Sequence, residues 1–171
     1  MTDIQTGWSN AAGSGDWIFV PAAAALQAVG LGASLVGATG LTVQAELDAS
    51  TSHQWVADLV TAVLISLFSD AAADDDDVIP DGTANRRGWW AGDIGSKLWL
   101  LSRVKATAGV ATQAEGYARD ALAWLVTDGI ASTVQVSSQW LSTSALALTI
   151  TITRASGTAV TLAFANLWDF L

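Results

Sequence analysis

The residues best suited to chemistry lie in the middle of the chain. Asp74-Asp75-Asp76-Asp77 could supply carboxylate oxygens to a hard cation such as Ca²⁺. A calcium loop of the EF-hand type needs acidic residues at alternate positions, a glycine at the sixth and a glutamate at the twelfth. The acids here are consecutive, and consecutive loop carboxylates repel one another and stay solvated. We therefore expect a solvated loop, and a calcium-dependent binding module is the alternative.

Arginine and tryptophan gather after this acidic run, in Arg86-Arg87-Gly88-Trp89-Trp90. One interpretation is a local lid, in which the tryptophans cover a helix and the arginines pair with the aspartates. The other is an interface anchor, because Trp and Arg dominate the hot spots of protein–protein interfaces. Residue types alone favour neither interpretation. The acidic surroundings argue against stacking on single-stranded nucleic acid.

Catalytic chemistry finds little support in the residues. The chain has no cysteine, which excludes disulfides, thiolate zinc sites and a cysteine nucleophile, and its one histidine is His53. We expect His53 to be a polar residue at the start of a helix. A glycosidase needs two carboxylates across a cleft, and no spacing selects such a pair, since Glu115 is better explained as part of a helix cap. We predict no enzymatic activity, no metal and no cofactor.

Composition points to an assembled protein. The 171 residues include 16 acidic and 7 basic ones, giving a net charge of −9, with 51% hydrophobic residues, 13% charged residues and 9 tryptophans. The mean hydropathy is +0.41. A surface poor in charge and rich in tryptophan suggests coverage by partners. Residues 17–45 carry no charge, but they include Pro21 and several glycines and lack flanking Lys or Arg, so we expect neither a membrane span nor a secretory signal.

The helical elements are expected in the central third. Val56, Leu59, Val60, Val63, Leu64 and Leu67 recur at helical spacing within 54–69, and Ile65 and Phe68 widen this stripe, which predicts a helix buried on most sides. A long polar connection follows over 70–93, and a short helix over 97–105. The pair Thr112 and Glu115 matches a capping box that opens a helix over 113–128, and Gly129 ends it.

The last third predicts antiparallel strands over 133–140, 146–153 and 160–164, because apolar residues alternate with polar ones there. Before the first helix, residues 1–16 predict an extended arm, 17–20 a short strand, 22–29 a helical turn, and 35–43 a hairpin. The predicted fold is α+β, with central helices packed on a C-terminal antiparallel meander and an N-terminal arm. The predicted organisation is an arm and Ala/Gly-rich insertion over 1–53 and a core domain over 54–171. The apolar end, 167–171, must dock on something.

Several stretches carry a resemblance to a known family. They are Leu59–Asp70 (LVTAVLISLFSD), the Asp-rich loop, Arg87-Gly88-Trp89-Trp90, Gly95–Leu101 (GSKLWLL), Tyr117-Ala118 and Ala121-Leu122 with Trp124-Leu125. In this order they resemble a tail baseplate family of Mu-like contractile bacteriophages. The resemblance covers residues 54–165 well, 1–20 loosely and 21–53 poorly.

The resemblance implies a structural role. Proteins of this kind are similar in role to the small wedge or sheath-initiator proteins of contractile tails, which sit around the central hub and tube, bind larger wedge proteins and offer strands to the first ring of the tail sheath. It implies six copies per baseplate, a place in the virion tail and assembly in the host cytoplasm. A cell-wall glycosidase riding on a tail stays an alternative, beside the calcium module.

The same reasoning assigns residues that bind partners. The expected anchors are aromatic or cationic: Arg87, Trp89, Trp90, Trp99 and Trp168. The strands 145–153 and 159–165, with Leu148, Ile150 and Ile152, are expected to accept a strand from another chain, since a two-stranded hairpin is a template for strand addition.

Overall fold

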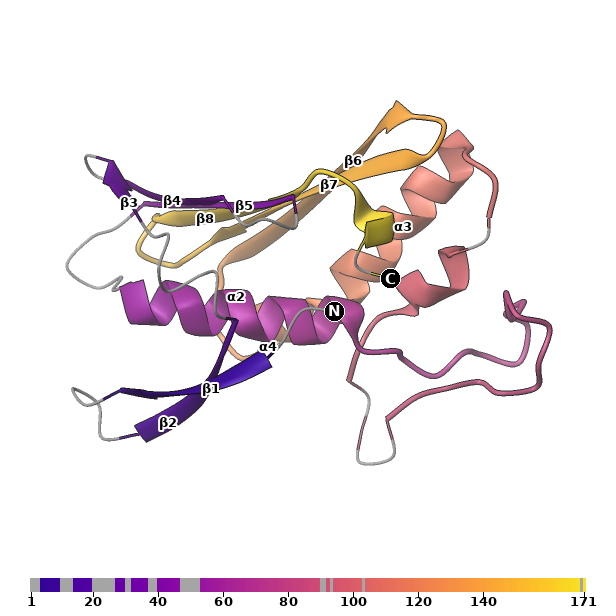
Figure 1. The fold of residues 1–171 in the computed structure, drawn as a ribbon, viewed down its shortest axis with the longest axis horizontal. Helices are drawn as coiled ribbons and strands as arrows, with labels where there is room; N and C mark the ends of the chain where they lie inside the picture. Colours follow the sequence, from indigo (N-terminus) through magenta and orange to yellow (C-terminus); the bar gives the residue numbers. More distant parts are fainter. Residues whose placement is uncertain are drawn as a thin grey trace.

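The computed structural model describes residues 4–9, 14–19, 27–29, 32–36, 40–46, 53–89, 92, 94–102, 104–169 and 171. Within them, an antiparallel sheet lies on one side of the molecule and the helices lie on the other (Figure 1). The expected α+β class is confirmed. The start of the chain, β1 (Ile4–Ser9) and β2 (Ser14–Phe19), forms a separate two-stranded hairpin on the side of α2 away from the sheet.

The sheet has six strands in the order β3-β4-β5-β8-β7-β6. Their bounds are β3 Gln27–Val29, β4 Gly32–Val36, β5 Leu41–Glu46, β6 Thr133–Ser142, β7 Ala145–Thr153 and β8 Ala159–Phe164. The meander β6-β7-β8 and the hairpin β4-β5 are confirmed. The helical turn expected over 22–29 is wrong for 27–29, which form β3, and 20–26 lie outside the described residues. β5 pairs with β8, so residues 41–46 share the sheet with the C-terminal strands.

The core lies between the inner face of this sheet and α2 (His53–Phe68). Alternation in β7 buries Leu146, Leu148, Ile150 and Ile152 completely, and each such side chain contributes about 1.5–3 kcal/mol. The six apolar α2 residues predicted to share a face are all buried. Phe68 packs edge-on against Phe164, with ring centroids 5.5 Å apart. Ile65 is 47% exposed, so α2 is buried on one face. The prediction that Ile65 widens the buried face of this helix is wrong.

The other helices are η1 (Lys97–Leu101), α3 (Ala108–Ala121), α4 (Trp124–Thr127) and η2 (Leu167–Asp169). α3 begins earlier than expected because Thr107 caps it, its Oγ1 accepting from the Val110 N–H at 3.3 Å. Thr112, the expected cap, lies inside α3 and donates to the Ala108 carbonyl. The predicted helix 113–128 is therefore two helices, and α4 ends before Gly129 as predicted.

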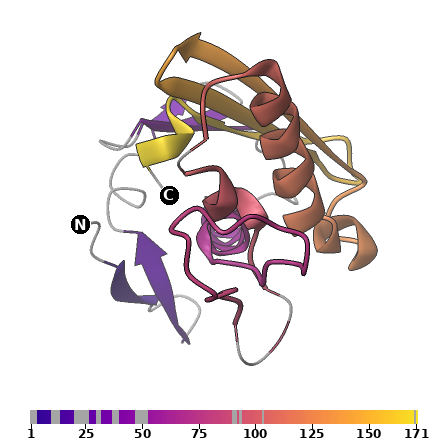
Figure 2. The same ribbon diagram turned by 90° about the vertical axis from the view of Figure 1, so that its right-hand side faces the viewer.

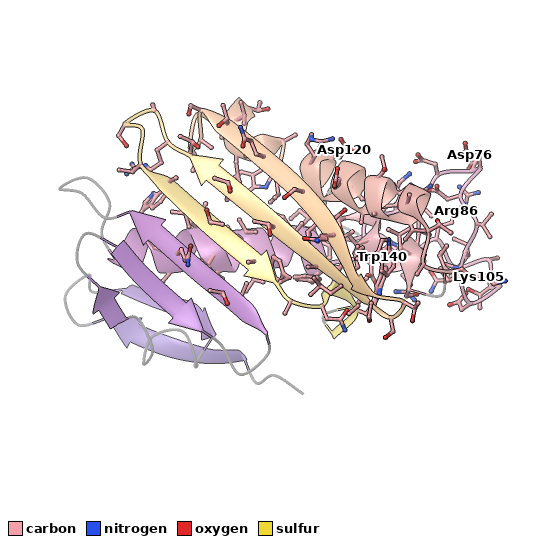
Figure 3. All side chains as sticks on the ribbon, turned by 90° about the horizontal axis from the view of Figure 1, so that it is seen from above. Asp76, Arg86, Lys105, Asp120 and Trp140 are labelled. Carbon is pink, nitrogen blue, oxygen red and sulfur yellow. The ribbon has the colours of Figure 1, made fainter. Side chains whose placement is uncertain are left out.

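None of the described helices lies over the outer face of the sheet, as Figure 3 shows from above. In β6, β7 and β8 the side chains on this face are uncharged, mostly Thr, Ser, Ala and Gln. α3 runs beside β6, at one edge of the sheet (Figure 2). Among the described residues, no helix is long and apolar enough to cross a bilayer.

Candidate partner-binding surface

A single bridge closes the long connection between α2 and η1. Asp70 and Ser96 form this parallel bridge: the Ser96 N–H donates to the Ser69 carbonyl at 2.9 Å, and the Ala71 N–H donates to the Ser96 carbonyl at 3.0 Å. Gly95 makes the approach possible, because it has φ +109 and a Cβ there would lie 2.4 Å from the Ser69 oxygen. We call residues 70–96 the clamped loop, since both of its ends are fixed beside the end of α2.

Lys97 holds the aspartate run against the domain. Its Nζ lies 2.7 Å from Asp77 Oδ2 and 2.5 Å from Asp74 Oδ2. The hydrogen bond from Lys97 holds the pKa of Asp77 below its ordinary value, although partial burial opposes this. Burial alone would lower the pKa of Lys97, but the bonds to both aspartates outweigh it and raise that pKa. The carboxylates of Asp74 and Asp77 are thus bonded to an ammonium group.

The other aspartates of the run remain at the surface, as expected. Asp75 and Asp76 are exposed, and Asp75 forms an ion pair with Arg86. No group of three or more His, Cys, Asp or Glu side chains in the described part of the chain could hold a metal ion. Arg86 thus pairs with the aspartate run as the lid interpretation expects, whereas Arg87 pairs with Asp70, outside the run.

Arg87, at the surface, packs against the buried Trp99. The Arg87 guanidinium donates to Asp70 Oδ2 at 2.7 Å and lies 4.3 Å from the centre of the Trp99 ring. Trp99 is buried, and its Nε1–H donates to the Ala71 carbonyl at 2.9 Å. Because the Arg87 side chain is 38% exposed, this cation–π contact contributes about 0.5–1 kcal/mol. Both residues were predicted as partner contacts. The structure corrects this for Trp99, which is an internal support of the clamped loop.

The clamped loop presents apolar side chains outward. Trp89 is 50% exposed and Val78 is 85% exposed, and Ile94 is also exposed. Gly88, just before Trp89, packs so close to the start of the clamped loop that an added Cβ would lie 2.8 Å from the Ala72 Cβ. Trp90 lies outside the described residues. Of these exposed residues, the sequence pattern singled out Trp89 as a partner contact, which stays a prediction. Val78 and Ile94 gave no signal, because isolated apolar residues are common in loops.

Three other predicted contact residues belong to the core. Leu148, Ile150 and Ile152 are fully buried against the helices. β7 is paired with β6 and β8, and β8 with β5 and β7. Neither strand therefore has a free edge or an exposed apolar face, and the assignment of these three residues to a partner contact is corrected. The free edges of the described sheet are those of β3 and β6.

The C-terminal residues dock on their own domain. Leu167 is buried, and the Trp168 ring lies 6.1 Å from the Trp140 ring of β6. Trp168 is half-buried, so one part of it supports β6 and another part remains at the surface.

Sequence reasoning missed a polar contact between α3 and β6. The Ser138 N–H donates to Glu115 Oε1 at 2.8 Å, and the Ser138 hydroxyl bonds the same oxygen at 2.9 Å. Glu115 was expected to cap its own helix, and the structure corrects this. A signal existed in the sequence: Ser138 is the polar member of an inward-facing series that also contains Val134, Val136 and Trp140.

A polar hollow lies at the same edge. It has a volume of about 400 Å³ and is lined by Arg119 of α3, residues 134–137 of β6, and Thr149 and Thr151 of β7. No carboxylate lines it, so it lacks the pair of acids that a glycosidase requires.

These features define a small α+β domain in which ion pairs fix a long loop and leave Trp89 exposed on it. A family profile described as Phage protein GP46 matches residues 59–159. The baseplate protein gp46 of Escherichia phage Mu is 46% identical over 107 residues, covering 60% of this chain and 74% of that protein. The Mu-like prophage FluMu protein gp46 of Haemophilus influenzae is 35% identical over 117 residues, covering 65% of this chain and 79% of that protein.

The chain belongs to the phage GP46 family of Mu-like baseplate proteins. The resemblance seen in the sequence is confirmed, and the chain has a structural role in the tail baseplate of the virion. No solved structure matches it.

Proposed function

We propose that this chain is a wedge component of a contractile tail baseplate, without enzymatic activity. It binds a larger wedge protein or the central hub through the clamped loop, and it offers a sheet edge to the first sheath ring. The observation that supports this proposal most directly is the clamped loop, which is fixed by internal ion pairs and displays Trp89 and Val78 to solvent.

A rigid loop favours binding for a physical reason. Association loses free energy when flexible segments become ordered, and a loop already held in place avoids much of that loss. The Lys97 and Arg87 ion pairs and the Gly95 bridge supply this order before any partner arrives. A half-exposed tryptophan on such a frame has the properties of an interface hot spot.

The proposed sheath contact moves from β7 and β8 to β6. A strand can be added only where backbone N–H and C=O groups are unpaired, and β6 forms an edge of the described sheet. The other two strands have neighbours on both sides. The strand order that excludes β7 and β8 as acceptors of an added strand therefore favours β6.

The test is Trp89→Ala, alone and with Trp90→Ala, in the phage that encodes the chain. Because Trp89 is half-exposed, we expect the variant to unfold within about 1 kcal/mol of the parent, while the yield of tails seen by electron microscopy falls at least about tenfold. Val126→Ala, which truncates an exposed residue of α4, is the matched control and should leave the yield unchanged. Normal yields of infectious tails from the double variant would refute the anchor role.

A further inference from the structure

The contact between Glu115 and Ser138 shows which backbone groups of β6 face outward. The Ser138 N–H donates to Glu115, on the side away from β7. In an antiparallel strand the N–H groups point alternately to the two sides. The N–H groups of Val134 and Val136 therefore point in the same outward direction as that of Ser138, toward the free edge.

Helix α3 covers only one part of this edge. Glu115 occupies the Ser138 N–H, and the Trp140 Nε1–H donates to the Thr107 carbonyl at 3.0 Å. The C-terminal half of β6 is thus closed by the N-terminal half of α3. Residues 134–137 border the polar hollow instead, so the accessible edge is a short stretch with two outward N–H groups.

Arg119 is the charged residue of that hollow. It lies one turn beyond Glu115 on α3, in the same hollow as Gln135 and Ser137. Arg86, Arg87 and Lys97 all form ion pairs, whereas Arg119 forms none within the part of the chain that the structure describes. The chain as a whole has a net charge of −9, so a cation left without an acidic partner beside a free edge is notable.

We propose that residues 133–137 accept one strand of another baseplate or sheath protein, and that Arg119 selects a strand carrying a carboxylate. The inference rests on the proposed strand addition at β6 and names the chemistry of the added strand. The incoming backbone bonds the outward groups of Val134 and Val136. One acidic side chain, on the outer face of the extended sheet, enters the hollow beside Gln135 and Ser137 and pairs with the guanidinium, a geometry that favours two parallel hydrogen bonds.

The experiment complements a phage lacking this gene with variants of the full chain. Arg119→Glu should lower the number of infectious particles at least about tenfold, which corresponds to losing one charge pair. Lys105→Glu makes the same charge change at an exposed residue before α3 (Figure 3) and should have no such effect. Val136→Pro removes an outward N–H without touching the ladder to β7 and tests strand addition itself. If Val136→Pro lowers the melting temperature, Val134→Pro replaces it, because it removes the other outward N–H.

The outcomes distinguish strand addition at β6 from recognition of an acidic side chain by Arg119. Losses with both Arg119→Glu and the proline variant support the proposal, and loss with the proline alone leaves strand addition standing while it overturns acidic recognition. If the proline variants assemble normally, strand addition at β6 is overturned. Selection for revertants of Arg119→Glu then identifies the occupant: an Asp or Glu changed to Lys or Arg in another tail protein supports the proposal. Such a change within this chain would mean that a second copy occupies the edge, and would overturn it.

Discussion

Gly95→Ala tests whether the bridge at the base of the clamped loop holds that loop in place. The glycine has φ +109, a conformation that residues with a side chain rarely adopt. The added Cβ would lie 2.4 Å from the Ser69 oxygen and 2.9 Å from the Ala71 nitrogen. Both neighbours are backbone atoms, so the clash cannot be relieved by turning a side chain, and the bridge between Asp70 and Ser96 must open.

The expected loss follows from two contributions. The backbone conformation costs about 1–2 kcal/mol for a residue with a Cβ. Opening the bridge removes two backbone hydrogen bonds, of 2.9 and 3.0 Å, each with a net contribution of about 1 kcal/mol. Together these give about 3–4 kcal/mol, which for a domain of this size lowers the melting temperature by about 10 °C.

Thermal and urea unfolding, followed by circular dichroism, measure this loss. Two glycines serve as controls. Gly82→Ala adds a Cβ at φ +70 with no atom within 4 Å, so it should lose only about 1 kcal/mol. Gly116 lies inside α3 with no atom within 4 Å of an added Cβ, so Gly116→Ala should gain about 0.5–1 kcal/mol. Equal losses for Gly95→Ala and Gly82→Ala would refute the role assigned to the close approach.

Two further predictions concern ionised groups. Lys97→Met removes the partner of Asp77, whose side chain is 18% exposed. It should lower the free energy of unfolding by about 2 kcal/mol, a value between those for exposed and buried ion pairs. Because the folded protein lowers the pKa of Asp77, the parent keeps this contribution above the ordinary pKa of 3.8 and loses it as the pH falls through the lowered pKa; in Lys97→Met, acid unfolding curves should lack that loss. Glu115→Ala removes an acceptor of two bonds from Ser138 and should cost about 2 kcal/mol, with faster amide hydrogen exchange at Ser138; unchanged exchange would contradict the contact.

The strands and helices with strong periodicity could be predicted from the sequence. Strict alternation in 146–153 fixed both the strand and its buried face, because an error of one residue would expose four large apolar side chains. The start of α3 could not be predicted in the same way. Thr107 and Thr112 are both capable caps, and only the packing of α3 along β6 decides between them.

The candidate site was predictable only where a residue type is unusual. Trp89 stood out because tryptophan and arginine cluster around Gly88, but the burial of Trp99 and the pairing of Arg87 depend on contacts between residues far apart in the chain. The position of β8 inside the sheet depends on its pairing with β5 (Leu41–Glu46), which the sequence predicted only as one arm of a local hairpin. Edge and interior strands can have the same alternation, so strand order requires the tertiary structure.

The pairing of β5 with β8, in which Leu41 lies opposite Phe164, has a consequence for biosynthesis. Residues 47–158 lie between these two strands, so a ribosome must translate all of them before β5 can pair with β8. Until then the edge of β5 that faces β8 has no partner. Pairing between strands so far apart in the chain is slow, and an unpaired strand edge favours aggregation. A polypeptide truncated before β8 would leave this edge of β5 unpaired and would be a substrate for chaperones and proteases.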